Sequence, residues 1–267
     1  MSRRPTVLAC LVTSTLLTLF AASPAEAATN YSDTDYVALG DSYTSGVGAP
    51  GQSGLCLRGS SGYPAQWTKN NDPASYRNVA CSGATTDDVN WFQVPYLSTK
   101  TDLVTITIGG NDAGFAPAVI TCTLSTDAGC AAVVASAHDY VTRVLPGKLD
   151  ATYRAIRRQA PEAQVVVLSY PILFDTTSTY CGIGGMSIAK RRSLNSGAQD
   201  VDELIKDRAK AAGFLFADVR DNFAGHGICA ANPWINGLTV IPPTDSFHPT
   251  ANGYTYGYLP AMNAALS

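Results

Sequence analysis

The stretch from Tyr36 to Gly48, YVALGDSYTSGVG, contains the transition that decides the fold. Its apolar run stops at Gly40-Asp41-Ser42, and small, flexible residues follow. A short apolar run that ends at glycine is typical of a strand buried on both faces, as in a parallel sheet. Ligands of such sheets bind beyond the carboxyl ends of the strands. Ser42 therefore lies where chemistry is expected, although a serine there can also be a helix cap or a turn residue.

The rest of the chain alternates strand and helix patterns. Short apolar runs rich in β-branched residues predict five strands, over Tyr36–Leu39, Tyr76–Ala80, Leu103–Ile108, Gln164–Ser169 and Phe214–Val219. Helical spacing of apolar residues predicts helices over Ala131–Gln159, Ser187–Ala212 and Ala251–Leu266. Pro146 and Gly147 should bend or divide the first of these helices. This alternation predicts an α/β fold with a parallel sheet and helices on both of its faces.

Composition limits the class of protein. The chain has 267 residues, of which 46% are hydrophobic and 15% are charged, so it is long enough and apolar enough for one folded domain. Its net charge of −3 does not favour nucleic-acid binding, which needs a basic surface. The sequence contains no repeat and no linker, so we expect one domain over residues 28–267.

The N-terminus resembles a secretory signal peptide. Arg3 and Arg4 precede an apolar stretch over Val7–Phe20, and an A-x-A cleavage pattern ends at Ala27. The apolar stretch is short for a membrane span. We expect residues 1–27 to be removed, with cleavage after Ala28 as the alternative, and the protein to be secreted to the extracellular medium.

The cysteines support this compartment. Of the seven cysteines, Cys10 lies in the predicted signal peptide. An even number of remaining cysteines in a secreted chain predicts disulfides, for which spacing alone leaves about 15 pairings open. We expect the sequential pairing, which closes the shortest loops: Cys56–Cys81, Cys122–Cys130 and Cys181–Cys229. Because no CxxC pair and no HExxH motif occurs, the sequence does not favour a metal site.

A serine nucleophile needs a base, and the chain has only three histidines. His138 lies in a helical pattern and His226 in a loop beside a predicted disulfide, so both are interpreted as structural. His248 lies in DSFHPTANGY, three residues after Asp245. A carboxylate at this spacing can reach the imidazole Nδ1 and orient the ring. Asp245 can equally be a turn or helix-cap residue.

Acyl transfer also needs donors for a developing oxyanion. Asn111 follows a predicted strand and two glycines in TITIGGNDAGF, and Gly83 follows another predicted strand in NVACSGATT. Each could donate into the space beyond the strand ends, or could belong to an ordinary turn. The tight G-x-S-x-G elbow of the α/β-hydrolases does not surround Ser42.

Apolar residues gather in the expected loops after the strands, which suits an acyl chain but equally suits loops pinned by core-facing side chains. They are Phe115, Pro117, Val119, Ile120, Ile172, Leu173, Phe174, Ile183, Met186, Trp234 and Ile235.

Four motifs in order now carry a family resemblance: GDSY near the start, CSGA after the second predicted strand, GGND after the third and DSFHP near the end. The chain resembles the SGNH (GDSL) hydrolases, and among them the secreted lipases, esterases and phospholipases A1 of Streptomyces. The resemblance covers nearly the whole chain after the signal peptide. It implies a three-layer α/β/α sandwich with a five-stranded parallel sheet, a flavodoxin-like arrangement. It also implies that Ser42 begins an exposed active-site loop rather than a tight elbow.

The family's roles transfer to matching positions. The resemblance implies Ser42 as nucleophile, His248 as base, and Ser42 N–H, Gly83 N–H and the Asn111 amide as oxyanion donors. Asp245 matches the orienting acid. The backbone carbonyl of Ser246 is the alternative acceptor for His248, because both arrangements occur in the family. No cofactor or metal is implied.

The expected function is that of a secreted serine carboxylic-ester hydrolase acting on lipid acyl esters, of the phospholipase A1 or lipase type. One alternative is a carbohydrate esterase of the acetylxylan type. Another, from a different class, is a catalytically inactive secreted binding protein on the same scaffold. The expected partner is a lipid or other ester substrate, with transient contact to lipid interfaces, no nucleic acid, and a monomeric protein.

Overall fold

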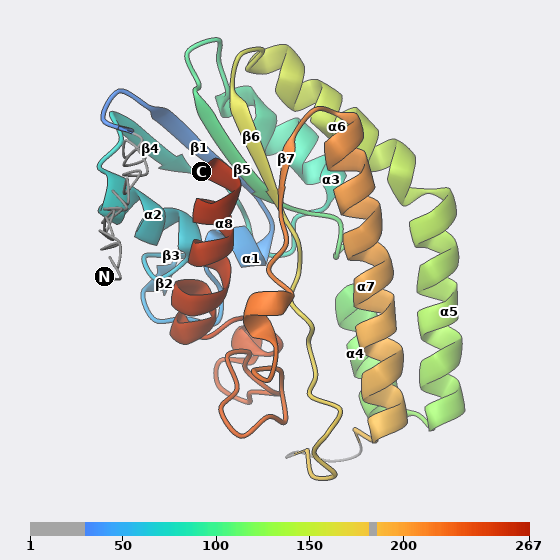
Figure 1. The fold of residues 1–267 in the computed structure, drawn as a ribbon. Helices are drawn as coiled ribbons and strands as arrows, with labels where there is room; N and C mark the ends of the chain where they lie inside the picture. The colour runs from blue at the N-terminus through green and yellow to red at the C-terminus, as the bar shows by residue number, and fades with distance from the viewer. Residues whose placement is uncertain (1–29, 182–185) are drawn as a thin grey trace, which may run out of the picture.

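The protein forms a parallel sheet between two layers of helices (Figure 1). The computed structural model describes residues 30–181 and 186–267. The predicted signal peptide, residues 1–27, and Ile183 lie outside the described residues.

Five strands form the main sheet in the order β4-β1-β5-β6-β7, and each neighbouring pair is parallel. The strands are β1 Asp35–Gly40, β4 Ser75–Asn78, β5 Leu103–Thr107, β6 Gln164–Leu168 and β7 Leu215–Ala217. In chain order this is the flavodoxin-like order, in which the second strand crosses to the outer side of the first. The predicted fold class and the five predicted strands are confirmed. A short hairpin, β2 Gln52–Ser53 and β3 Arg58–Gly59, lies outside this sheet.

Helices cover both faces of the sheet (Figure 1). One face carries α2 Tyr63–Asn71, the π-helix η5 Gly253–Tyr258 and α8 Leu259–Leu266. The other carries α3 Thr86–Asp88, α6 Leu145–Gln159 and α7 Ile188–Ala211. Two further helices, α4 Phe115–Leu124 and α5 Asp127–Arg143, pack with the lower half of α7 beyond the carboxyl ends of the strands. The short helices are α1 Ser42–Ser45, η1 Val89–Gln93, η2 Val94–Tyr96, η3 Asp221–Phe223 and η4 Pro243–Asp245.

One helix prediction is confirmed and one loop prediction is wrong. The division predicted for the helix over 131–159 is confirmed: the segment forms α5 and α6, which meet at Val144. Pro146 stands in the first turn of α6, where its missing N–H costs nothing. The segment from Phe115 to Ile120 was expected to be a loop but belongs to α4. Pro117 does not prevent this helix, because it too lies in the first turn.

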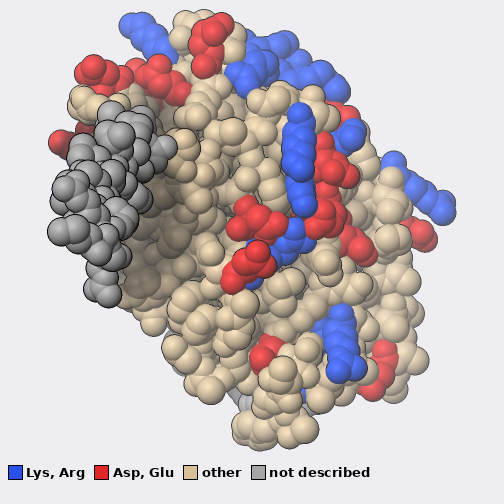
Figure 2. All heavy atoms as spheres, viewed as in Figure 1, with Lys and Arg blue, Asp and Glu red and all other residues tan. Residues whose placement is uncertain are grey.

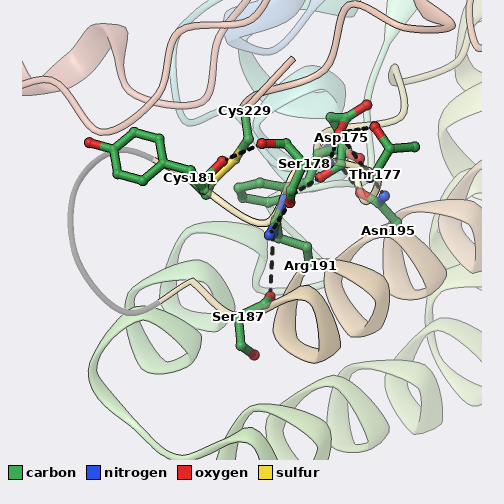
Figure 3. The surroundings of a disulfide bond; sticks show 10 residues. Asp175, Thr177, Ser178, Cys181, Ser187, Arg191, Asn195 and Cys229 are labelled. Carbon is green, nitrogen blue, oxygen red and sulfur yellow. Dashed lines mark hydrogen bonds between the residues drawn. A yellow bond between two sulfur atoms is a disulfide. The ribbon is translucent and has the colours of Figure 1, made fainter. Parts of the chain in front are cut away.

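The six cysteines of the described residues are joined in the sequential order, as Cys56–Cys81, Cys122–Cys130 and Cys181–Cys229. The first bond ties the segment between β2 and β3 to the loop that carries Gly83. The second ties α4 to α5, and the third ties the loop after β6 to the loop after β7 (Figure 3).

A buried arginine holds the loop after β6 against α7 (Figure 3). Arg191 of α7 is fully buried and donates to the carbonyl of Asp175 at 2.7 Å and to that of Ser178 at 2.8 Å. Asn195, one turn further along α7, exchanges two hydrogen bonds with the backbone of Phe174, at 3.0 and 2.8 Å. These contacts fix a loop that borders the carboxyl ends of the strands.

Candidate active site

Ser42 is positioned by the way that β1 ends. Gly40 has φ of 124°, and a Cβ there would collide with the carbonyl of Thr107, so only glycine fits this turn. Asp41 then caps helix α1 by accepting a hydrogen bond from the Tyr43 N–H at 2.9 Å. Ser42 is therefore the first residue of a short helix and is only 6% exposed. The expectation of an exposed loop is wrong, because the capped helix folds the segment back against the sheet.

His248 meets Ser42 from the other end of the chain. Its Nε2 lies 2.7 Å from the Ser42 Oγ, a hydrogen-bond distance. The Tyr43 ring lies 5.3 Å from the imidazole, and the Tyr43 hydroxyl donates to the carbonyl of Phe247 at 2.7 Å. Phe247 has φ of 64°, an uncommon value for a residue with a side chain, and this turn aims the next residue at Ser42. Tyr43 and Phe247 were missed by the sequence reasoning.

The environment of His248 keeps the imidazole neutral. Burial lowers its pKa from 6.5 to about 4, while the carbonyls of Ser246 and Thr244 and the charge of Asp245 act in the opposite direction. A neutral imidazole can accept a proton from Ser42 at neutral pH. The Nδ1 atom is buried, and no described residue makes a hydrogen bond of good geometry with it.

The Asp245 carboxylate makes its hydrogen bond with a residue other than His248 in this geometry. Its Oδ1 accepts a hydrogen bond from the Gln52 side chain at 2.6 Å, and no hydrogen bond between its carboxylate and His248 exists in the described structure. Asp245 ends the 3₁₀ helix η4, and its carboxylate is engaged with Gln52 of the β2–β3 hairpin, a partner distant in the sequence. Among nearby acceptors, the backbone carbonyls before His248 remain.

Two of the three predicted oxyanion donors, Gly83 and Asn111, lie on loops that are hydrogen-bonded to each other. The Asn111 side-chain amide donates to the Ala84 carbonyl at 2.9 Å. The neighbouring Asp112 carboxylate accepts from the Thr86 N–H at 2.9 Å and from its hydroxyl at 2.7 Å. These bonds hold Gly83 close to Asn111. The Asn111 nitrogen carries a second N–H that can serve a ligand.

A cavity of about 440 Å³ brings the site together. Ser42, Gly83, Asn111 and His248 line its polar end. The remainder, which we call the apolar cavity, lies between α4, α5 and α7, and includes Ala118, Ile120, Val134, Val141, Leu194 and Val201 among its lining residues. Several positions there are small, including Ala137 and Gly197, which leaves room between the helices. Most of the side chains named in this part of the cavity are aliphatic, so it can accommodate an apolar group.

The predicted apolar loop residues divide in the structure. Phe115, Ile120 and Leu173 line the apolar cavity. The other described ones do not: Pro117, Val119, Ile172, Phe174, Met186, Trp234 and Ile235. The sequence analysis did not predict that α5 and α7 line this cavity. Small and aliphatic residues at helical spacing in both helices could have indicated it.

The other two histidines lie elsewhere, as the sequence indicated. His138 Nδ1 is 2.7 Å from Asp200 Oδ2, a contact between α5 and α7. His226 stacks on Trp234 with ring centres 3.6 Å apart, and its Nδ1 bonds with the Asn232 carbonyl at 2.8 Å. Neither lines the cavity at Ser42.

A buried acid lies directly before Ser42. Asp41 accepts a hydrogen bond from the Tyr170 hydroxyl, which itself accepts one from the Gly110 N–H at 2.9 Å. Burial raises the pKa of Asp41 from 3.8 to about 7, although the hydrogen bonds from Tyr170 and Tyr43 counteract part of this rise. Tyr170 was also missed. Tyr170 directly follows the fourth predicted strand, at the carboxyl edge of the sheet, and this position could have indicated that it lies near the site.

Residues 30–181 and 186–267 hold no cluster of three or more His, Cys, Asp or Glu side chains suited to a metal ion. In the same part of the chain, no helix combines the length and apolarity that a membrane span requires.

Similarity to known proteins agrees with this geometry. The chain is 44% identical to a lipase from Streptomyces rimosus, with 99% of each chain covered, and 42% identical to Lipase 1 from Streptomyces coelicolor, with 97% and 96% covered. Its structure is similar to an extracellular lipase from Streptomyces rimosus, at 46% identity and a TM-score of 0.83, with 87% of this chain and 99% of that one covered. It is also similar to a phospholipase A1 from Streptomyces albidoflavus, at 43% identity and a TM-score of 0.84, with the same coverage.

A more distant structure has the same fold: an acetylxylan esterase from Geobacillus stearothermophilus, at 18% identity and a TM-score of 0.53, with 89% of this chain and 96% of that one covered. The model of the GDSL-like lipase/acylhydrolase family matches residues 38–256. The chain therefore belongs to the GDSL-like lipase/acylhydrolase family and is a carboxylic ester hydrolase.

Proposed function

We propose that the protein hydrolyses acyl esters of lipids through an acyl-enzyme formed on Ser42. The observation that carries the proposal is the 2.7 Å contact between Ser42 Oγ and His248 Nε2 at the polar end of the apolar cavity. A hydroxyl bonded to a neutral imidazole is the arrangement that activates a serine nucleophile.

The first half-reaction forms the acyl-enzyme. His248 Nε2 takes the hydroxyl proton as Ser42 Oγ attacks the ester carbonyl carbon. The tetrahedral intermediate carries a negative charge on the former carbonyl oxygen. When this intermediate collapses, His248 returns the proton to the leaving oxygen, which departs as the alcohol, and the acyl group stays on Ser42.

The second half-reaction releases the acid. His248 takes a proton from a water molecule as that water attacks the acyl carbonyl. Collapse of this second intermediate breaks the bond to Ser42 Oγ, which regains its proton from His248. The products are the carboxylic acid and the free enzyme.

The oxyanion donors are the Ser42 N–H, the Gly83 N–H and the second N–H of the Asn111 amide. Gly83 and Asn111 line the same polar end as Ser42, on loops that hydrogen bonds hold together. Fixed donors of this kind stabilise the transition state without having to reorganise.

His248 is oriented by the backbone carbonyls before it rather than by Asp245. The Asp245 carboxylate is engaged by Gln52 at 2.6 Å, whereas the carbonyl dipoles of Ser246 and Thr244 favour a proton on the imidazole. The resulting arrangement is a Ser–His dyad in which Ser246 supplies the acceptor for Nδ1.

The apolar cavity supports a fatty-acyl substrate. Its aliphatic walls continue far beyond what an acetyl group needs, which disfavours the acetylxylan-type alternative. The acetylxylan esterase noted above shares only the fold at its level of identity. The relatives reported above at 42–46% identity are named as lipases, an extracellular lipase and a phospholipase A1. An inactive binding protein would not need the Ser42–His248 contact.

The outer surface near the cavity is consistent with access to lipid. Figure 2 shows few Lys, Arg, Asp or Glu side chains at the lower end of the molecule, over the loops that follow the strands. Leu238 lines the cavity, and the nearby Val240 and Ile241 are 75% and 90% exposed. These side chains suit transient contact with a lipid interface.

Secretion completes the proposal. Residues 1–27 act as the signal peptide, residues 28–267 form one hydrolase domain, and the protein works outside the cell as a monomer. The three disulfides suit an oxidising compartment.

The test compares hydrolysis of phosphatidylcholine, a triglyceride and acetylated xylan by the wild type and by Ser42→Ala, His248→Ala and His138→Ala. We expect fatty acid release from a lipid, its loss in the first two variants and its retention in the third. A serine-directed phosphonate should add its mass to Ser42 and not to Ser42→Ala. Release of acetate alone, or activity that survives His248→Ala but not His226→Ala, would contradict the proposal.

A further inference from the structure

A second cavity adjoins the active site. It has a volume of about 640 Å³ and shares Ser82 and Gly83 with the apolar cavity. Gly83 is a proposed oxyanion donor, so the ester carbonyl would lie at the junction of the two spaces. Because the acyl and alcohol parts of an ester leave its carbonyl carbon in different directions, one cavity can hold each part.

The second cavity has a basic wall, formed by Arg58 and Arg77, and we call it the arginine cleft. Arg58 donates from Nε to the Ala80 carbonyl at 2.8 Å and from Nη2 to the Val79 carbonyl at 3.2 Å. These acceptors orient the guanidinium but carry no charge. The Arg77 guanidinium lies 5.3 Å from the centre of the Tyr96 ring.

The two arginines of the cleft, Arg58 and Arg77, form no ion pair with a carboxylate of the described residues. Asp88 is the one acidic residue that lines the cleft, and its Oδ2 accepts both from the Thr85 N–H at 2.8 Å and from the Thr85 hydroxyl at 2.7 Å. This carboxylate serves as a helix cap. The cleft therefore presents net positive charge beside the reaction centre.

We propose that the arginine cleft binds the phosphate of a glycerophospholipid, which places the phosphorylated alcohol there while the acyl chain occupies the apolar cavity. This inference rests on the proposed function and assigns its substrate class. Guanidinium groups match the oxygens of a phosphate in charge and geometry, and they stay protonated at every physiological pH. A neutral glyceride would leave both cations without an anionic partner.

The kinetic test uses Arg58→Gln, Arg77→Gln and the double variant, with Arg143→Gln as a matched control on the exposed surface of α5. The two substrates are a phosphatidylcholine and a diacylglycerol of the same short acyl chains, presented in the same neutral detergent micelles. We expect kcat/KM for the phospholipid to fall about tenfold for each arginine removed, the loss of one charge-assisted hydrogen bond. The diacylglycerol rate and the Arg143→Gln variant should change less than about twofold, the range of neutral surface substitutions.

Two kinetic outcomes would overturn the inference. Equal losses on both substrates would make the arginines structural, and an unchanged preference would mean that the phosphate does not contact them. Arg77→Gln keeps the test informative if Arg58→Gln fails to fold, because no hydrogen bond to the backbone ties Arg77 into the described structure.

A binding test separates this inference from the proposed function. Ser42→Ala protein, which cannot turn over, is titrated with glycerophosphocholine and with inorganic phosphate by calorimetry. We expect glycerophosphocholine to bind and the double arginine substitution to abolish binding. Phosphate that binds better than glycerophosphocholine would indicate a free-anion site and overturn the lipid assignment. If the wild type hydrolyses no ester, the proposed function is wrong. The titration still tests whether the arginine cleft binds the phosphodiester.

Discussion

The hydroxyl of Tyr170 donates a hydrogen bond to the carboxylate of Asp41, the residue directly before Ser42. The same hydroxyl accepts the Gly110 N–H at 2.9 Å. Asp41, Gly110 and Tyr170 follow β1, β5 and β6 respectively, so one phenol links the carboxyl ends of three neighbouring strands. Asp41 also caps α1, and its position therefore determines where Ser42 begins that helix.

Replacing Tyr170 should loosen the position of Ser42 without removing any group that is proposed to react. Tyr170→Phe removes the donor to Asp41 and the acceptor of Gly110, leaving buried polar groups unsatisfied. We expect the free energy of unfolding to fall by about 1–3 kcal/mol and kcat to fall more than KM changes. Steady-state kinetics and urea unfolding measure this. Tyr256→Phe, at an exposed position, is the matched control, and equal behaviour of the two variants would remove Tyr170 from its positioning role.

Asp41 should make stability depend on pH in a defined direction. Its folded pKa of about 7 lies above its ordinary value of 3.8, so the folded state holds a proton that the unfolded state has lost. Stability from this group is therefore greatest below pH 3.8 and is lost as pH rises to 7, by up to about 4 kcal/mol. Asp41→Asn removes the effect. Urea unfolding of both proteins from pH 4 to 8 tests it, and a constant difference between them would refute the assignment.

His248 should remain an active base in mildly acidic solution. With a pKa lowered to about 4, the imidazole is neutral above that pH, and the acid limb of kcat/KM should lie near pH 4 rather than 6.5. A soluble neutral ester is the substrate, so that only the free enzyme titrates. The profile is repeated in Asp41→Asn, which removes the second nearby titration. An acid limb at pH 6.5 in both proteins would mean that His248 is hydrated in solution.

Asn111 is expected to act on the transition state. Asn111→Ala should lower kcat by roughly 10²–10³, with a smaller change in KM, as for other oxyanion donors. Because its amide also bonds to Ala84, the melting temperature is measured alongside. A kcat that falls only in proportion to lost folded protein would assign Asn111 a structural role alone.

Asp245 gives the sharpest distinction between dyad and triad. Asp245→Asn preserves the size of the side chain and leaves an oxygen to accept from Gln52. With the Ser246 carbonyl as the acceptor for His248, kcat should fall less than about tenfold, whereas loss of a true triad acid costs up to roughly 10⁴. A steep loss that Gln52→Ala does not reproduce would restore Asp245 as the orienting acid.

The sequence by itself determined the sheet and named the candidates for the site. Five apolar, β-branched runs mark the strands because parallel strands are buried on both faces and leave little choice of side chain. Ser42, Gly83 and Asn111 each lie three residues after the end of such a run, and parallel strands bring their carboxyl ends to one edge. Three histidines left few choices of base.

Only the tertiary structure decided how these residues are oriented and what surrounds them. The sequence spacing of Asp245 and His248 suited a triad, but the side chain turns to Gln52, a partner 193 positions away in the chain. Tyr170 and the arginine cleft likewise depend on neighbours from separate strands and loops. The apolar cavity exists because small residues on α5 and α7 meet α4, a helix that was expected to be a loop. Local sequence patterns predict which residues are buried and which backbone conformation they prefer. The direction of a side chain and the shape of a cavity depend on contacts between segments that are distant in the sequence, and hydrophobic periodicity does not encode these contacts.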